Sequence, residues 1–509
     1  MTIPGLNINL ESDLPVYRQI ADGIRDALAD GRLEHGRRLP PTRDLARQLG
    51  VNRNTVVAAY ELLASDGVVR SHTGRGTFLA AATPTRDDRL GASPDDEVWR
   101  TAFSRAVEGA NVERLLSAYR LATSVEGISF ATGFPADDLT PVDEFSRAVA
   151  DVLAERGTEV LTYGPLSGSP GLREHIAADM RRRGSEVSAD QILITNGSQQ
   201  AIEIVFRTLI DPGDPVVLED PTFAGALSAL GSLGARLVGV PMDDQGIRAD
   251  LLALALERHR PRLIYLQPTF QNPTTSVMSA ERRRQVLSLA ARHGCVIVED
   301  DWAGDLRLDG RDLPTLHATD GGRRVIYVSS FSKKLMPGLR IGWVAAPLGV
   351  QQRLISLKQI EDCGTSPLLQ EALHRFLLDG GLERHLTKIR AVYRERRDAM
   401  LHAIDKHFPE DVRVLKPKGG LFVWVRLPRG IDVNELFLAA RHRGVLFSPG
   451  ELFDVDRTGQ NTLRLTFAAV GPEETASGIE TLGRLMKEIR SEGSPEVSDE
   501  SSVVVMPIV

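Results

Sequence analysis

The chain has 509 residues, of which 42% are apolar and 25% are charged, and its formal net charge is −7 at pH 7. This length predicts two or three domains, and the composition is that of a soluble globular protein. A negative net charge argues against a chain that coats nucleic acid or membrane along its whole length, but it permits one local basic face. The two cysteines, Cys295 and Cys363, exclude a disulfide framework. The sequence shows no basic-then-apolar signal segment and no apolar run of membrane-spanning length, so we expect a cytoplasmic protein without a membrane partner.

Residues 1–80 have the pattern of a compact N-terminal unit. Apolar residues recur at helical spacing in the first part, and a proline pair, a glycine and an Asp-Gly turn separate the segments that follow. Three helices and a two-stranded wing make a winged helix-turn-helix. The elements predicted are helices over residues 16–29, 42–49 and 52–65, with Thr42 as N-cap of the second, and strands over residues 68–71 and 77–80.

A local basic face belongs to this unit. From Arg32 to Arg53 there are six arginines against two acids, a surplus that phosphate binding needs. A recognition helix reads base edges with its N-terminal residues; an arginine there can address guanine and an asparagine adenine. Charge alone is equally compatible with a solvated, arginine-rich surface. On the DNA-binding reading, the contact residues are Asn52, Arg53, Asn54, Thr55 and the wing residue Arg75.

The order of residues over 12–80 closely resembles the GntR-family DNA-binding domain. This resemblance is specific and covers nearly the whole unit. It implies that Arg43, Arg53, Thr55 and the wing from Gly74 to Thr77 contact operator DNA. The motifs that carry it include Leu14-Pro15-Val16-Tyr17, Arg38-Leu39-Pro40-Pro41-Thr42-Arg43, Asn54-Thr55-Val56 and Gly74-Arg75-Gly76-Thr77-Phe78.

The remainder of the chain divides into a linker, a large domain and a tail. Residues 81–125 are polar and turn-prone at first and then predict a helix. From about residue 128, helices alternate with short apolar strands, which predicts an α/β sheet covered on both faces. Residues from about 375 predict a smaller, helix-rich α+β cap, so that this domain spans 126–490, and the acidic, serine-rich residues 491–509 predict a disordered tail. The strands predicted are 192–195, 216–219, 263–267, 295–299, 325–329 and 341–346, with 420–426 and 462–467 in the cap.

Lys333 is the first lysine of the chain. It follows the apolar run 325–328 and a serine-rich turn, and Arg340 stands seven residues later. A pyridoxal-phosphate (PLP) enzyme presents its Schiff-base amine in this way, with hydroxyl and guanidinium groups nearby to hold the phosphate. A coding preference for arginine explains the scarcity of lysine, and a surface lysine after a strand is the plain alternative for Lys333.

Other strand ends carry groups that PLP chemistry needs. Ser198 opens a helix after a strand, where backbone N–H groups bind phosphate. Phe223 can lie over the pyridine ring, although a core phenylalanine is the more ordinary role when this residue is taken without its neighbours. Asn272 can reach the ring hydroxyl, and Asp300 can pair with the pyridine nitrogen and keep it protonated, although a helix-capping or turn acid is a common use. Because strand ends converge at one edge of an α/β sheet, these residues can share one crevice.

Together these segments closely resemble the fold-type I PLP-dependent aminotransferases over residues 128–490. The resemblance implies that Lys333 forms the Schiff base and that Asp300, Asn272 and Phe223 contact the ring. It implies that Arg464 binds the carboxylate of an amino compound; otherwise Arg464 is an ordinary strand arginine. No metal is implied. The phosphate is assigned to Ser198, Gln199, Ser330 and Arg340, with Tyr163 reaching the phosphate of the partner subunit.

Two positions depart from the family pattern. Trp302 stands where the family usually places a tyrosine that contacts the cofactor, and Thr275 stands where a glycine is typical. Both changes permit PLP binding and count against efficient turnover.

A GntR-like head joined to an aminotransferase-like domain is the architecture of the MocR/GabR-type transcriptional regulators. This resemblance implies a homodimer that binds operator DNA and senses an amino-compound effector through an aldimine at Lys333. The alternative is an active class I/II aminotransferase that carries a DNA-binding head. A dimerisation module that has lost PLP is a third class, which the complete set of cofactor residues disfavours.

Overall fold

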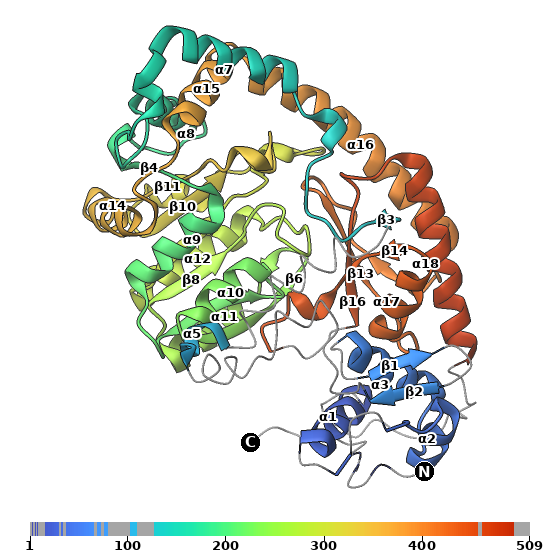
Figure 1. Cartoon of the computed structure of the whole chain (residues 1–509). Helices are drawn as coiled ribbons and strands as arrows, with labels where there is room; N and C mark the ends of the chain where they lie inside the picture. Colours follow the sequence, from blue (N-terminus) through green and yellow to red (C-terminus); the bar gives the residue numbers. More distant parts are fainter. Residues whose placement is uncertain are drawn as a thin grey trace.

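The computed structural model comprises a small N-terminal head, a large domain and a C-terminal cap (Figure 1). It describes residues 16–29, 32–33, 37–65, 69–72, 76–79, 102–108, 127–456 and 461–492, together with Ile3, Leu6 and Ile8. Most of the expected linker and tail lies outside these residues. Of residues 81–125, only 102–108 are described, with the single turn α5 (Arg105–Glu108). Of residues 491–509, only the first two are described, and they end a helix.

The head is a winged helix-turn-helix, as the sequence predicts. Pro41, rather than Thr42, is the N-cap of its second helix, and Gly50 ends that helix in the left-handed conformation that suits glycine (φ 67°). The two wing strands pair antiparallel. The core residues include Ile20, Ile24, Leu45, Val56, Leu63 and Leu79. The elements are α1 (Val16–Ala29), α2 (Thr42–Leu49), α3 (Arg53–Ser65), β1 (Val69–His72) and β2 (Gly76–Leu79).

The large domain is built on an eight-stranded sheet of order β4-β11-β10-β9-β8-β5-β6-β7. All strands are parallel except β11 and β7, which run antiparallel to their neighbours. β6 and β7 were not among the predicted strands. The strands are β4 (Ile192–Thr195), β5 (Pro215–Asp220), β6 (Arg236–Asp243), β7 (Gly246–Ile247), β8 (Leu263–Leu266), β9 (Val296–Asp300), β10 (Val325–Ser330) and β11 (Gly342–Ala345).

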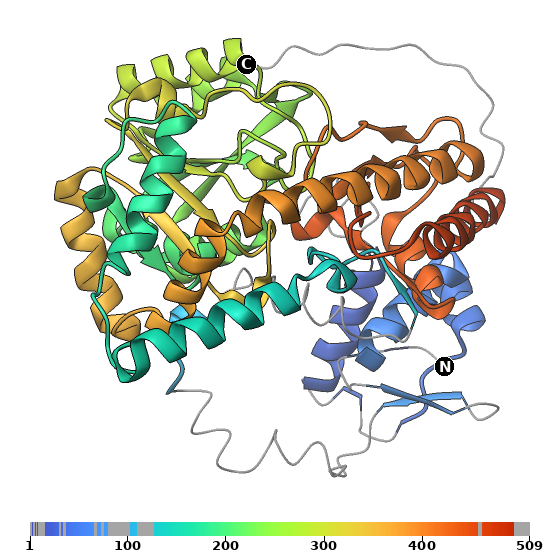
Figure 2. The ribbon, with the colours of Figure 1, turned by 90° about the horizontal axis from the view of Figure 1, so that it is seen from above.

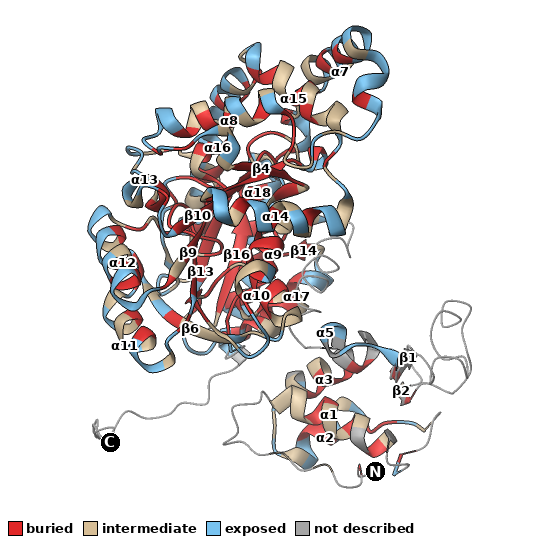
Figure 3. Cartoon of the chain, turned by 90° about the vertical axis from the view of Figure 1, so that its left-hand side faces the viewer, coloured by how far each residue is buried: buried red, intermediate tan, exposed pale blue. Residues whose placement is uncertain are grey.

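Helices cover both faces of this sheet, and its strands other than β6 are largely buried (Figure 3). Successive residues of a strand enter different cores: Leu263 and Tyr265 pack on one face, and Ile264 and Leu266 on the other. None of the described helices is both long enough and apolar enough to cross a membrane. The helices are α7 (Val142–Arg156), α8 (Pro170–Arg182), α9 (Gly197–Leu209), α10 (Ala224–Ser232), α11 (Ala249–His259), α12 (Ala280–His293), α13 (Leu316–Asp320), α14 (Leu348–Asp362) and α15 (Pro367–Leu378).

The cap contains a four-stranded sheet of order β12-β13-β16-β15 and a short parallel pair, β14-β3. The expectation that the cap begins near residue 375 is therefore incomplete, because β3 brings residues 128–129 into it. The long helix α16 runs from the large domain to the cap (Figure 2). The cap elements are β3 (Ile128–Ser129), α16 (Gly381–His407), β12 (Arg413–Val414), β13 (Phe422–Arg426), α17 (Val433–His442), β14 (Val445–Leu446), β15 (Ser448–Pro449), β16 (Thr462–Thr466) and α18 (Pro472–Glu492).

Candidate functional site

Asp300, the last residue of β9, is a buried carboxylate with one free oxygen. Its Oδ2 accepts hydrogen bonds from the Tyr265 hydroxyl (2.6 Å) and from Nε2 of Gln267 (2.7 Å). Its Oδ1 is buried and has no donor among the described residues. Burial raises the pKa of Asp300 to about 6, although the two hydrogen bonds act in the opposite direction. A carboxylate oxygen held in this way requires a donor, such as a protonated ring nitrogen.

Gln267 connects Asp300 to Asn272. While its Nε2 donates to Asp300, its Oε1 accepts from the backbone N–H of Asn272 (3.0 Å). The side chain of Asn272 is oriented from the other side, because its Oδ1 accepts from Nη1 of Arg464 (2.8 Å). One hydrogen-bond network thus joins Asp300 and Asn272, which are expected to contact the cofactor, to Arg464, which is expected to contact the ligand.

Lys333 and Lys334 face different surroundings. The Lys333 amine lies 5.2 Å from the centre of the Phe134 ring, and burial, with the charges of Arg464 and Arg340, lowers its pKa to about 8. The Lys334 amine is 2.6 Å from Oδ2 of Asp305, in a buried ion pair. Lys334 is therefore committed to a structural contact, and Lys333 is the amine available for chemistry.

The expected phosphate site lies at the N-terminus of α9. Gly197 has φ +81°, and a Cβ there would lie 2.6 Å from Nη2 of Arg340, so only glycine lets the guanidinium come this close. Nη2 of Arg340 donates to the carbonyl of Asn196 (3.0 Å). Ser198 is half-buried in the first turn of α9, where backbone N–H groups and the helix dipole favour an anion. Ser330 ends β10, and Gln199 donates from Nε2 to the carbonyl of Gly225 (3.1 Å).

Phe223 is half-buried at the N-cap of α10, where it packs against the core on one face of the sheet. Trp302 is held in place, because its indole N–H donates to the carbonyl of Phe270 (3.0 Å) and its ring packs 5.5 Å from that of Phe422. Trp302 thus has no second polar atom to replace the contact that the family's tyrosine makes with the cofactor. Thr275, at the glycine position of the family motif, adopts a left-handed conformation (φ 61°) that is strained for a β-branched residue.

Arg464 of β16 is a buried cation with no carboxylate partner among the described residues. Its guanidinium lies between the rings of Phe422 (4.0 Å) and Phe453 (4.7 Å). Nη2 donates to the Ala131 carbonyl (3.0 Å) and the Ser448 hydroxyl (3.3 Å), while Nε is buried and has no acceptor in the part of the chain that the structure describes. Burial lowers the pKa of Arg464 to about 9, which an anionic ligand would reverse.

Tyr163 does not join the other candidate residues within the chain. Its side chain is 86% exposed. It lies in a surface hollow of about 510 Å³ that Leu161, Cys363 and Pro367 also line. An aromatic side chain this exposed is available to a second subunit.

Of the expected DNA-contacting residues, Arg43, Asn52 and Arg53 are exposed, whereas Thr55 and Thr77 are half-buried. Nε of Arg53 donates to the Thr42 hydroxyl (3.4 Å), which joins the starts of α3 and α2. The backbone of Asn54 lies in the first turn of α3, but its side chain is not among the described groups. Arg75 lies outside the described residues.

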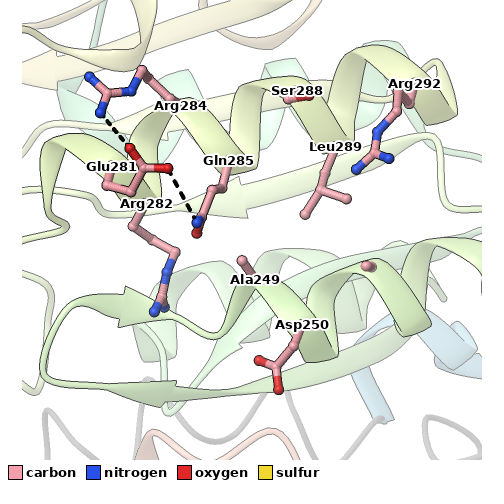
Figure 4. Close-up of a pocket in the computed structure, with 10 residues that line it drawn as sticks. Ala249, Asp250, Glu281, Arg282, Arg284, Gln285, Ser288, Leu289 and Arg292 are labelled. Carbon is pink, nitrogen blue, oxygen red and sulfur yellow. Dashed lines mark hydrogen bonds and ion pairs between the residues drawn. The ribbon is translucent and has the colours of Figure 1, made fainter.

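A hollow on the outer surface, between α11 and α12, contains none of the expected site residues (Figure 4). Arg284 pairs there with Glu281 on its own helix, and Arg282 pairs with Asp243 (2.9 Å). The Arg284–Glu281 pair is solvated and contributes little to stability. Arg282 is mostly buried and also donates to the carbonyl of Gly246 (3.3 Å).

Sequence reasoning missed five residues that hold the site: Tyr265, Gln267, Phe422, Ser448 and Phe453. Tyr265 and Gln267 could have been recognised from the sequence. They are polar-headed residues spaced i, i+2 at the end of an apolar strand, and this spacing places both side chains on the same face. The other three lie on the cap, and their sequence carries no local sign that they surround Arg464.

Comparison with known proteins matches both parts of the chain. Residues 125–482 match the family described as aminotransferase class I and II, and residues 16–79 match the bacterial regulatory proteins of the gntR family. The probable rhizopine catabolism regulatory protein MocR of Rhizobium meliloti is 31% identical over 96% of this chain and 97% of its own. The HTH-type transcriptional regulator YisV of Bacillus subtilis is 32% identical over 96% of this chain and 100% of its own. The chain belongs to the MocR-type regulators.

The aminotransferase fold of this MocR-type chain is also found in solved structures. LysN, an alpha-aminoadipate aminotransferase from Thermus thermophilus, is 38% identical, covers 77% of this chain and 99% of its own, and has a TM-score of 0.72. It was solved with N-(5'-phosphopyridoxyl)-L-leucine. The expected winged helix-turn-helix joined to a fold-type I domain is thereby confirmed.

The residues present in the MocR-type chain fit pyridoxal 5'-phosphate. The free Oδ1 of Asp300 suits a protonated pyridine nitrogen, the glycine cradle beside Arg340 suits a phosphate, and the Lys333 amine suits an aldehyde. These three features lie at the carboxyl ends of β9, β4 and β10, which meet at one edge of the sheet.

Proposed function

We propose that this protein is a PLP-dependent, homodimeric transcriptional regulator whose binding to operator DNA changes when a carboxylate-bearing amino compound enters the pocket. The observation that carries the proposal is the guanidinium of Arg464. It is buried, lacks an anion among the described residues and is close enough to lower the pKa of Lys333. A site with a cationic clamp near an amine-exchanging group recognises a molecule with both a carboxylate and an amine.

Each residue of the pocket has a separate role in this proposal. The cofactor, when bound, supplies an aldehyde that reacts with amines and a ring that accepts electrons. Asp300 would keep a proton on the ring nitrogen, and Asn272 would bind the ring hydroxyl. Lys333 has an amine pKa of about 8, so a useful fraction is unprotonated near neutral pH. Arg464 orients the ligand by its carboxylate.

The homodimer is supported by Tyr163. Its 86% exposed ring lies beside Leu161, which is 65% exposed, and near the hollow formed by residues 363–367. Apolar and aromatic side chains this exposed are typical of a surface that a second subunit covers. Tyr163 then reaches the phosphate of the partner subunit.

DNA binding is assigned to the winged helix. Arg43, Asn52 and Arg53 are exposed on α2 and at the start of α3, as direct contacts with DNA require. The named regulators that align over nearly the whole chain support the same assignment.

The second candidate function is amino-group transfer by a catalytically active domain. It is favoured by Asp300, Asn272, Lys333 and Arg464, which are all present, and by the 2-aminoadipate transaminase of Thermus thermophilus, which is 39% identical over 76% of this chain and 97% of its own. The regulator is preferred because Trp302 has no polar atom left for the cofactor and Thr275 strains the loop that carries Asn272.

Titration of the PLP-loaded protein with a panel of amino acids tests the proposal. The absorbance of the cofactor and the affinity for the DNA upstream of the protein's own gene are measured in parallel. We expect at least one amino acid to change both. A keto acid is then added as amino-group acceptor. Steady formation of a second keto acid, together with a change in absorbance but none in DNA affinity, would establish the second candidate instead.

A further inference from the structure

A short segment of the cap touches both Arg464 and the DNA-binding head. We call residues 448–455 the strap; it contains β15, the 3-10 turn η7 (Gly450–Leu452) and the residues up to Val455. At its first residue, the Ser448 hydroxyl accepts from Nη2 of Arg464 (3.3 Å) and donates to the carbonyl of Ala131 (3.1 Å). Further on, Phe453 covers the guanidinium of Arg464. The strap is therefore part of the wall of the proposed effector site.

The strap is attached to its surroundings along its whole length. β15 pairs with β16 so that Ser448 lies opposite Arg464. Gly450 packs so closely on β16 that a Cβ would lie 2.0 Å from Oγ1 of Thr462. The carbonyl of Phe453 accepts from the N–H of Thr222 (2.9 Å), one residue before the expected ring-stacking Phe223. A shift at Ser448 is thus transmitted to the residues that follow.

The outer side of the strap contacts the head. Nη2 of Arg18, on α1, lies 3.3 Å from both carboxylate oxygens of Glu451. The two side chains are 32% and 25% exposed, so the pair is partly shielded from water. Nε of Arg18 donates to the Tyr17 hydroxyl (3.2 Å), which holds the guanidinium in place. The recognition helix α3 also contacts α17 of the cap, and the head lies beside the cap in Figure 1.

We propose that the strap is the docking surface for the winged helix and that it couples the effector carboxylate to the head through the Arg18–Glu451 pair. This inference rests on the proposed function. A carboxylate bound by Arg464 competes with the Ser448 hydroxyl for the N–H of Nη2. Because Ser448 and Glu451 lie three residues apart in a packed segment, loss of that hydrogen bond moves Glu451 and weakens its hold on Arg18.

The strength of the pair suits a reversible contact. A partly exposed arginine–carboxylate pair shifts an equilibrium by no more than roughly fivefold. A contact of this strength favours the docked position of the head only weakly. A small displacement of the strap is therefore enough to release the head. Thermodynamic linkage then requires the reverse effect as well: a head held on DNA changes the affinity for the ligand by the same factor.

Two reduced cofactor conjugates test the coupling. N-(5'-phosphopyridoxyl)-L-alanine carries a carboxylate for Arg464, and N-(5'-phosphopyridoxyl)-ethylamine is its counterpart without the carboxylate. The full-length apo-protein is loaded with one or the other, and its affinity for the DNA upstream of its own gene is measured by fluorescence anisotropy. We expect the two forms of the wild type to differ about fivefold.

Charge variants assign this difference to the pair. Glu451→Gln should reduce the difference to less than about twofold, and the charge swap Arg18→Glu with Glu451→Arg should restore it. Glu480→Gln, which removes an exposed charge from α18 of the same cap, should respond like the wild type. Each variant should still bind both conjugates, because Arg18, Glu451 and Glu480 are assigned neither to the cofactor nor to the carboxylate.

The outcomes separate the coupling from the proposed function. If Glu451→Gln still distinguishes the two conjugates as the wild type does, the strap does not carry the signal, although the sensing function stands. If the wild type binds both conjugates and the DNA but shows no difference between them, carboxylate sensing itself is wrong, and the coupling fails with it.

Discussion

Replacement of Gly197 by alanine tests the phosphate site most sharply, because the chain offers a matched control. Gly197 and Gly213 both have positive φ values, +81° and +89°. An alanine at Gly197 would place its Cβ 2.6 Å from Nη2 of Arg340, whereas nothing lies within 4 Å of a Cβ at Gly213. The two variants share the backbone strain and differ only in the effect on Arg340.

Both alanine variants should lose about 1–2 kcal/mol of stability, because a left-handed backbone disfavours a residue with a Cβ. The further effect at Gly197 falls on cofactor affinity, because Arg340 is a flexible side chain that moves away at little cost in stability. Once displaced, it loses its hydrogen bond to the Asn196 carbonyl and its position beside the phosphate. A charge-assisted hydrogen bond contributes about 1.5–3 kcal/mol, so the Kd for PLP should rise about 10- to 150-fold.

The assay compares the two variants in two ways. The midpoint of thermal unfolding of the apo-proteins should fall by a similar amount in both. Titration with PLP, followed by absorbance, should show weak binding only for Gly197→Ala. Equal PLP affinity in the two variants would refute the assignment of Arg340 to the phosphate.

Three further predictions concern Lys333, Lys334 and Arg53. Lys333→Ala should abolish the borohydride-trapped link to PLP, whereas Lys334→Ala should keep it and lose up to about 3 kcal/mol of stability with its buried Asp305 partner; a trapped peptide centred on Lys334 would reverse the assignment. Because an amine attacks only when unprotonated, PLP attachment to the apo-protein should accelerate up to about pH 8 and then level off, in accord with the lowered pKa of Lys333; acceleration that continues to pH 10 would mean an ordinary lysine pKa. Arg53→Ala should weaken binding to specific DNA by about 1–3 kcal/mol while the PLP spectrum is unchanged, as gel shifts at several salt concentrations can show; an unchanged affinity and salt slope would remove Arg53 from the DNA contacts.

Local sequence was enough to locate most of the candidate site. Asp300, Asn272 and Lys333 each follow an apolar strand, and parallel strands end at one edge of the sheet, so their convergence could be inferred from the order of residues alone. The helix and wing boundaries of the head were also predictable, because periodicity and turn residues mark them locally.

What could not be predicted depends on contacts between distant residues. Arg464 meets Asn272 across 192 positions of sequence, and Arg18 meets Glu451 across 433. No local pattern encodes such a pair. The position of β3 in the cap was missed for the same reason, because two residues near 128 pair with a strand near 445. The hydrogen bond from the Trp302 indole to the carbonyl of Phe270 could not be predicted either, because it joins two loops that are distant in sequence.

The central claim is most directly tested by the effect of Arg464→Ala on DNA binding in the presence of an amino acid that alters the wild-type cofactor spectrum. The variant should keep the PLP spectrum, since Arg464 is assigned to the ligand and not to the cofactor. Its unliganded DNA affinity should shift towards that of the liganded wild type, because the hydrogen bond to Ser448 is lost. Its response to the amino acid should require about 10- to 150-fold higher concentrations, the effect of losing a charge-assisted hydrogen-bond clamp. An Arg464→Ala protein whose DNA binding still responds at wild-type concentrations would contradict the account, as would sustained amino-group transfer by the wild type at about 1 per second or faster.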